Sequence, residues 1–210
     1  MSFVVNDTPA SSGGSVTAAA VIDALSVAPL AGTWTDTEAD GATIAVDEDG
    51  AVAVIPDGVA ACAAYSTTPW PADEIYDVRA KLTITGTTNA NVITYLIAAY
   101  GGSWVFFRCR GDGRIDIKHN IGGDTGLANV TGRPVDGTGE LRFAVRGTRV
   151  TAWYRTGSAA WTLLYDDDVA GLAGLAAPTL LRVQGATEGG ALGAETTITW
   201  SDVTIRSGLA

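Results

Sequence analysis

Histidine and cysteine are scarce in this sequence, and their scarcity excludes several kinds of catalytic site. A Ser-His-Asp or Cys-His site would have to use His119, the single histidine. A zinc site is excluded on the same ground, because one histidine and two widely separated cysteines do not supply its ligands. No GxSxG, Walker or dinucleotide-binding motif occurs. We therefore predict no catalytic residues and no metal ligands, and we expect His119 to lie exposed at the end of a strand.

The two cysteines, Cys62 and Cys109, are too few for a disulfide framework. Both lie among apolar or strand-like neighbours, which favours buried thiols. A bridge between the two remains the alternative.

Long apolar runs are also missing. No stretch approaches the roughly 18 apolar residues of a membrane span, so we expect no membrane insertion. The first 14 residues lack a basic segment followed by an apolar core, so they do not predict a secretory signal. We expect a protein that is made in the cytosol and, if it acts outside the cell, is released by lysis or by a dedicated route.

Positive charge is absent from residues 1–78, which contain twelve acidic residues. Residues 79–155 contain eleven basic and five acidic residues, and residues 156–210 contain two basic and six acidic residues. The net charge of −10 argues against binding to nucleic acid. The basic middle segment allows one local surface for an anionic partner.

Short β-branched and aromatic segments divided by Gly-rich turns predict an all-β fold. We expect strands at 42–47, 51–55, 75–85, 92–100, 103–110, 114–119, 139–146, 149–155, 161–166, 180–184 and 196–205. The domain is expected to span residues 33–210, after an N-terminal lead-in or docking segment at residues 1–32. Within that segment, residues 16–27 are the one helix candidate, and a strand is the alternative.

Alternation along the middle strands separates an apolar face from a polar face, because side chains point to opposite sides of a strand in turn. If these strands are neighbours in one sheet, their polar faces merge into a single cationic surface that bears tryptophans. Aromatic rings suit the apolar side of a sugar, and guanidinium groups suit hydroxyls and carboxylates. We predict ligand-binding roles for Trp104, Arg108, Arg110, Arg142, Trp153 and Arg155. The competing interpretation is a polar face that pairs with the acidic first 78 residues, in the same chain or in a neighbouring subunit.

Residues 139–166 read as strand, tight turn at Gly147-Thr148, strand, loop and strand. This segment, the closing strand ITWSDVTI and the opening segment 32–56 together resemble concanavalin A-like lectin/glucanase and laminin-G-like domains. The resemblance implies a two-sheet antiparallel jelly-roll sandwich, with 32–56 as its first hairpin and the last strand lying beside the N-terminal strand.

Glycanases of this resembled fold carry a Glu-x-Asp-x-x-Glu motif on one strand. The most similar stretch here has Arg114 and His119 at the glutamate positions and retains only Asp116. One carboxylate cannot act as both acid and nucleophile, so we expect no retaining glycosidase activity. We expect no cofactor, with Ca²⁺ as an alternative at the oxygen-rich turns 47–50, 111–113 and 166–168.

Domains of this kind are common in phage tail and virion proteins, and the excess of Arg over Lys, eleven to two, fits a GC-rich host. The first hypothesis is therefore a non-enzymatic virion protein, in tail or capsid surface, that binds host-surface polysaccharide. It would assemble with other virion proteins, as a homo-oligomer. It predicts that Trp104→Ala or Arg108→Ala abolishes retention on glycan without lowering the melting temperature. The alternatives are a purely structural virion decoration or fibre domain and a glycan-acting hydrolase.

Overall fold

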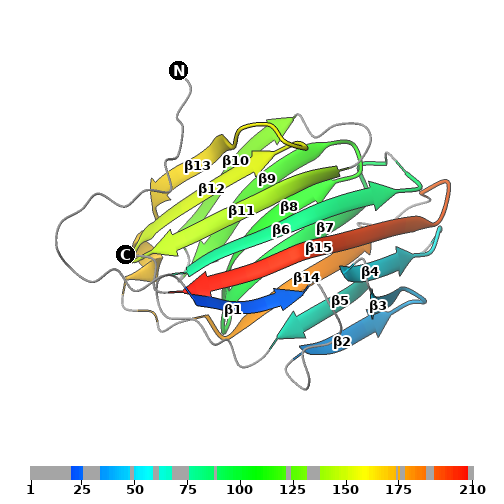
Figure 1. The fold of residues 1–210 in the computed structure, drawn as a ribbon, viewed down its shortest axis with the longest axis horizontal. Helices are drawn as coiled ribbons and strands as arrows, with labels where there is room; N and C mark the ends of the chain where they lie inside the picture. The colour runs from blue at the N-terminus through cyan, green and yellow to red at the C-terminus, as the bar shows by residue number, and fades with distance from the viewer. Residues whose placement is uncertain are drawn as a thin grey trace.

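The protein forms two stacked antiparallel β-sheets (Figure 1), here described from a computed structural model. The structure describes residues 20–25, 34–47, 50–58, 62–67, 76–87, 89–121, 124–131, 138–173, 175, 178–187 and 192–207. Sheet A has the strand order β13-β12-β11-β6-β15-β4-β3, with β1 also paired to β15. Sheet B has the order β10-β9-β8-β7-β14-β5-β2. The all-β jelly-roll class predicted from the sequence is confirmed.

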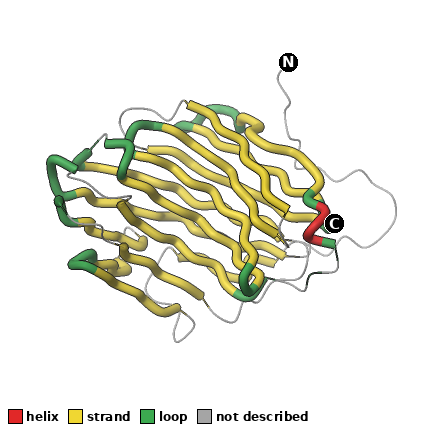
Figure 2. Tube along the Cα trace, turned by 180° about the vertical axis from the view of Figure 1, so that it is seen from behind, coloured by secondary structure: helices red, strands yellow, loops and turns green. Residues whose placement is uncertain are grey.

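Sheet A contains β1 (Ala20–Leu25), β3 (Thr43–Asp47), β4 (Gly50–Ile55), β6 (Tyr76–Thr85), β11 (Thr138–Arg146), β12 (Arg149–Arg155), β13 (Thr162–Asp168) and β15 (Thr196–Ser207). Sheet B contains β2 (Trp34–Ala39), β5 (Cys62–Thr67), β7 (Val92–Tyr100), β8 (Ser103–Arg110), β9 (Arg114–Ile121), β10 (Asp124–Thr131) and β14 (Leu180–Thr187). The short 3-10 helix Ala170–Leu172 lies at one end of the sandwich (Figure 2). Among the described residues, no helix is long and apolar enough to cross a membrane.

All eleven predicted strands are present, and four further strands join them. The first of these, β1, is formed by residues 20–25, so the strand alternative for residues 16–27 is adopted there. The pairing of β1 with β15 places residues 20–25 in sheet A and sets the closing strand beside the N-terminal strand, as the resemblance implied. The other three strands are β2, β5 and β10. Ala, Gly and Asn weaken the β-signal in β5 and β10, and the pairing with neighbouring strands overrides that weakness.

The expected first hairpin at 32–56 is wrong in its first half. β3 and β4 pair as a hairpin in sheet A, but β2 pairs with β5 in sheet B. The turn around Asp40, where φ is 57°, therefore carries the chain from one sheet to the other. Sequence alternation does not distinguish such a crossing from a hairpin turn.

The core lies between the inner faces of the two sheets. Its largest fully buried side chains include Trp200, Tyr76, Phe107 and Phe143. Cys109 is buried in the same core, as the thiol interpretation expected, whereas the side chain of Cys62 lies outside the described residues.

The expectation of an exposed His119 is wrong. The histidine occupies an inward position of β9 at 6% exposure, and its ring lies 6.2 Å from that of Tyr165 in the opposite sheet. The strand β9 continues to Ile121, so His119 lies within the strand and not at its end.

Candidate functional site

The expected single cationic surface is divided between the two sheets. Strand β8 belongs to sheet B, whereas β11 and β12 belong to sheet A. In each strand the apolar side chains fill the core, so the polar sets face outward on opposite sides of the sandwich. Trp104, Arg108 and Arg110 thus lie far from Arg142, Trp153 and Arg155. The cause is the connection after β10, at which the chain crosses between the sheets.

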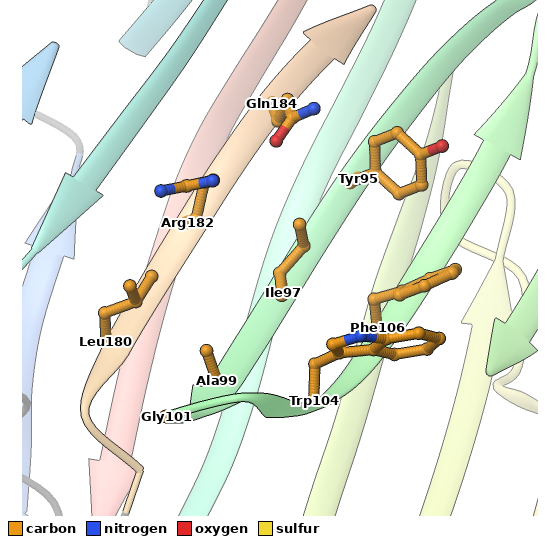
Figure 3. Close-up of a pocket in the computed structure, with 9 residues that line it drawn as sticks. All are labelled: Tyr95, Ile97, Ala99, Gly101, Trp104, Phe106, Leu180, Arg182 and Gln184. Atoms are coloured by element: carbon orange, nitrogen blue, oxygen red, sulfur yellow. The ribbon is translucent and has the colours of Figure 1, made fainter. Parts of the chain in front are cut away.

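On the outer face of sheet B, three strands form a groove of about 450 Å³ (Figure 3). β7 provides the floor, with β14 on one side and β8 on the other. The lining residues are Tyr95, Ile97, Ala99, Gly101, Trp104, Phe106, Leu180, Arg182 and Gln184. All nine are exposed or partly exposed, so a ligand can reach them.

The strand register explains why the groove is open. Ile97 pairs with Arg182 on one side and Phe106 on the other, and Ala99 pairs with Leu180 and Trp104. At these two positions the side chains on β7 are therefore shorter than their neighbours on β14 and β8, whereas Tyr95 on the same strand joins the aromatic wall. Larger side chains along both edges with small ones between them produce a channel that runs along β7.

The wall formed by β8 and Tyr95 is aromatic. The rings of Trp104 and Phe106 are stacked, with centroids 4.5 Å apart and an interplanar angle of 26°. Tyr95 meets Phe106 edge to face at 5.2 Å. Because each ring is held by its neighbour, the wall is ordered before any ligand arrives, and little side-chain entropy remains to be lost on binding.

Arg108 and Arg110 lie on the same strand face as Trp104 but make internal contacts. Arg108 Nε donates to Asp116 Oδ2 at 2.7 Å, and this carboxylate has no exposed area. Arg110 Nη1 donates to the carbonyl of Ala90 at 3.1 Å. Both arginines thus stabilise the sheet beside the groove, and neither is among its lining residues.

The outer face of sheet A carries a second aromatic and cationic cluster, in which arginine guanidinium groups lie over the tryptophan rings. The guanidinium of Arg142 lies 4.9 Å from the ring centroid of Trp153 and is also paired with the buried Asp77. Arg155 donates to Glu140 at 2.6 Å and lies 4.6 Å from the Trp161 ring, which Arg79 also approaches, at 5.4 Å. Each of these cation–π contacts competes with a sugar for a face of the ring.

Sequence reasoning identified Trp104 but missed most of the groove. Phe106 lies two residues after Trp104 on the same strand and therefore on the same face, so the sequence indicated its outward position. Arg182 and Gln184 likewise share a face of the predicted strand 180–184. Their meeting with Tyr95 depends on the pairing of β14 with β7, which are separated by 79 residues in sequence, and no local pattern reports it.

Carboxylates are scarce beside the groove. Along β7, β8, β9 and β14, the one acidic side chain on the outer face is Asp116.

Of the turns considered for Ca²⁺, the acidic strand end at 166–168 is engaged in part: Asp166 accepts from Arg149 Nε at 2.7 Å and Asp168 from Thr148 at 2.9 Å. The pairing with Arg149 lowers the pKa of Asp166. Within the described ranges, no group of three or more His, Cys, Asp or Glu side chains is arranged to hold a metal ion.

No protein-family model matches the sequence, and no curated protein does so either. Solved structures do match. The carbohydrate-binding module CBM66 from Bacillus subtilis matches with a TM-score of 0.56 and 13% identity, over 83% of this chain and 96% of that chain. A β-glucanase from Bacillus licheniformis matches with a TM-score of 0.60 and 9% identity, over 88% and 96%. The Ca²⁺-bound exoplasmic/lumenal domain of VIP36 matches with a TM-score of 0.56 and 12% identity, over 81% and 83%. These likenesses establish the fold as the concanavalin A-like jelly roll that the sequence resembled.

Proposed function

We propose that this protein binds glycans in the groove on the outer face of sheet B and does not cleave them. The observation that carries the proposal is the ordered aromatic wall of Tyr95, Phe106 and Trp104 facing the polar side chains Arg182 and Gln184 across a floor of Ile97 and Ala99. A sugar ring has an apolar face that stacks on aromatic rings and hydroxyls that need planar hydrogen-bond donors and acceptors. The groove supplies aromatic rings on one side and polar hydrogen-bonding groups on the other.

Binding without hydrolysis is favoured by the scarcity of carboxylates. A retaining glycosidase needs two carboxyl groups about 5–5.5 Å apart, and an inverting enzyme needs two about 6.5–9.5 Å apart. Asp116 is the single acidic group on the outer face of β7, β8, β9 and β14, and Arg108 holds it in an ion pair. The likeness to the module CBM66 supports the same function, whereas the likeness to a β-glucanase favours the hydrolase alternative.

The test replaces Trp104, which we expect to contribute most of the stacking area. Trp104→Ala should weaken retention on a binding polysaccharide by about 10- to 100-fold, because stacking contacts on an aromatic side chain are worth about 1–3 kcal/mol. Affinity electrophoresis across a polysaccharide panel measures the loss. Trp153→Ala is the matched control, since it removes the same side chain from the other sheet, where Arg142 covers the ring.

Equal losses in Trp104→Ala and Trp153→Ala would contradict the assignment of the groove. Release of reducing sugar from any panel member by the wild-type protein, abolished on replacing an acidic residue, would favour the hydrolase instead.

We further propose that the protein is displayed on a phage virion, in the tail or on the capsid surface. The excess of Arg over Lys, eleven to two, supports this context because it fits a GC-rich host. A purely structural virion role predicts an oligomer that dissociates in high salt and no retention on any glycan. Detection of the protein in purified particles, together with tail and lysis genes beside its own, would test the location.

A further inference from the structure

We infer that the groove selects anionic glycans, with the carboxylate of an acidic sugar paired to Arg182. The inference rests on the proposed glycan-binding function and names the class of sugar that the groove receives.

The outer face of sheet B is rich in positive charge. Along β7, β8, β9 and β14, this face carries Arg108, Arg110, Arg114, Lys118 and Arg182 against one carboxylate, Asp116. Arg108 and Asp116 form an ion pair, and basic side chains outnumber acidic ones along these four strands of a chain whose net charge is −10. A polyanion is therefore repelled by the molecule as a whole and attracted at this face.

Arg182 on β14 lies within the groove itself. It is the one charged side chain among the nine lining residues, and no lining residue is acidic. Figure 3 shows its guanidinium on the β14 side of the floor, across Ile97 from Phe106. Two strand spacings separate β14 from β8, about 10 Å, so one sugar ring can contact the aromatic wall and the guanidinium together.

The chemistry of the polar edge of the groove favours a carboxylate ligand. Gln184 can already hydrogen-bond sugar hydroxyls from the same edge of the groove, so Arg182 adds charge to a site that has neutral polar groups. Its planar fork matches a carboxylate through two parallel hydrogen bonds, which a lone hydroxyl does not provide. Lys118 pairs with Phe106 on the far side of the aromatic wall and extends the positive potential beyond the groove.

The experiment compares each acidic polysaccharide with its own neutral counterpart. Polygalacturonate, alginate and hyaluronan are run in affinity electrophoresis beside their carboxyl-reduced forms, which keep the same linkages, and beside dextran sulfate. We expect the wild-type protein to bind a carboxylated polymer at least 10 times more tightly than the reduced form. Arg182→Gln should bind that polymer about 10- to 100-fold more weakly than the wild type does, and it should discriminate little between the carboxylated and reduced forms.

Arg146→Gln is the matched control, because it removes the same charge from an exposed position on sheet A. It should bind as the wild type does, and near-ultraviolet circular dichroism should confirm that both variants are folded. Equal binding to carboxylated and reduced polymers, or an Arg182→Gln variant that binds as the wild type, overturns the inference and leaves the glycan-binding function intact. Equal losses in the two variants, with dextran sulfate bound as well as any carboxylated polymer, would show general polyelectrolyte attraction and also overturn it. Retention on none of the polymers, neutral or acidic, removes both proposals.

Discussion

Arg108 is a buried residue of sheet B at 9% exposure, and its partner Asp116 has no exposed area. Removing one member of such a pair leaves the other charge buried without compensation. The expectation that Arg108→Ala acts on binding alone, without lowering the melting temperature, is therefore replaced. We now expect this variant to lose about 3–5 kcal/mol of unfolding free energy, measured by urea denaturation.

The exposed Arg114 provides the control for this prediction. Arg114→Ala should change the stability by no more than about 0.5 kcal/mol. The double variant Arg108→Met/Asp116→Leu should recover most of the loss, because it removes both charges and keeps the volume. An Arg108→Ala protein as stable as the wild type would contradict the burial of this pair.

Tyr76 is buried in the core, Tyr100 packs against the core, and their hydroxyl groups share a hydrogen bond. Burial is the main cause that raises the pKa of each phenol above its ordinary value. A group whose pKa is higher in the folded state contributes stability that is complete below its unfolded pKa, about 10, and is lost as the pH rises toward the folded value. The unfolding free energy should therefore fall above about pH 10, by up to about 1.4 kcal/mol per pH unit for each phenol.

Tyr76→Phe should lose about 1 kcal/mol of unfolding free energy at neutral pH, because it removes the shared hydrogen bond. The unfolding free energy of this variant should also fall less steeply at alkaline pH than that of the wild type. The double variant Tyr76→Phe/Tyr100→Phe should remove the contribution of the pair altogether. Chemical denaturation between pH 8 and 11 measures both slopes. Identical slopes for the wild type and the double variant would refute the prediction.

At the scale of single elements, the hairpin between β3 and β4 depends on one glycine. Gly50 adopts φ of +118°, and a Cβ at this position would lie 2.2 Å from the carbonyl oxygen of Trp200 in the neighbouring β15. Gly50→Ala therefore adds a backbone clash to an unfavourable φ, and we expect a loss of about 1–3 kcal/mol or more.

Gly58→Ala separates the two effects in this prediction. Gly58 has φ of +83°, and no atom lies within 4 Å of the place that a Cβ would take, so its substitution carries the conformational cost alone. Thermal denaturation should rank Gly50→Ala as clearly the less stable variant. Equal melting temperatures would mean that β15 moves away to accommodate the new methyl group.

Among the elements, strict alternation predicted several strands and apolar, aromatic-bearing runs such as β7 predicted others, whereas strands rich in small residues were not predicted. β8, β11 and β12 alternate apolar and polar residues, and their bounds follow the pattern to within one residue. β9 alternates in the same way but extends two residues beyond its predicted end. β5 and β10 are rich in small residues and were missed, although each pairs along its length with a neighbouring strand. Their strand conformation is imposed by partners distant in the chain.

At the scale of the whole molecule, the two outer faces of the sandwich have different chemistry. The face of sheet B has an open aromatic groove with one buried carboxylate beside it. The face of sheet A has tryptophans covered by arginines that are paired with Asp77 and Glu140. The difference means that variants on sheet A serve as controls for variants on sheet B, although all these residues had been expected on one surface.

The amino-acid order alone specified the β class, eleven strands and the outward direction of Trp104, Arg108, Arg142 and Trp153. It did so because a period of two residues is a local property that can be read along one strand. The membership of each strand in sheet A or sheet B came from long-range pairing, above all from the crossings after β2 and β10. Alternation assigns a side chain to a face but carries no information about the neighbouring strand, so the joining of β14, β7 and β8 into a groove depended on the packing of the whole chain.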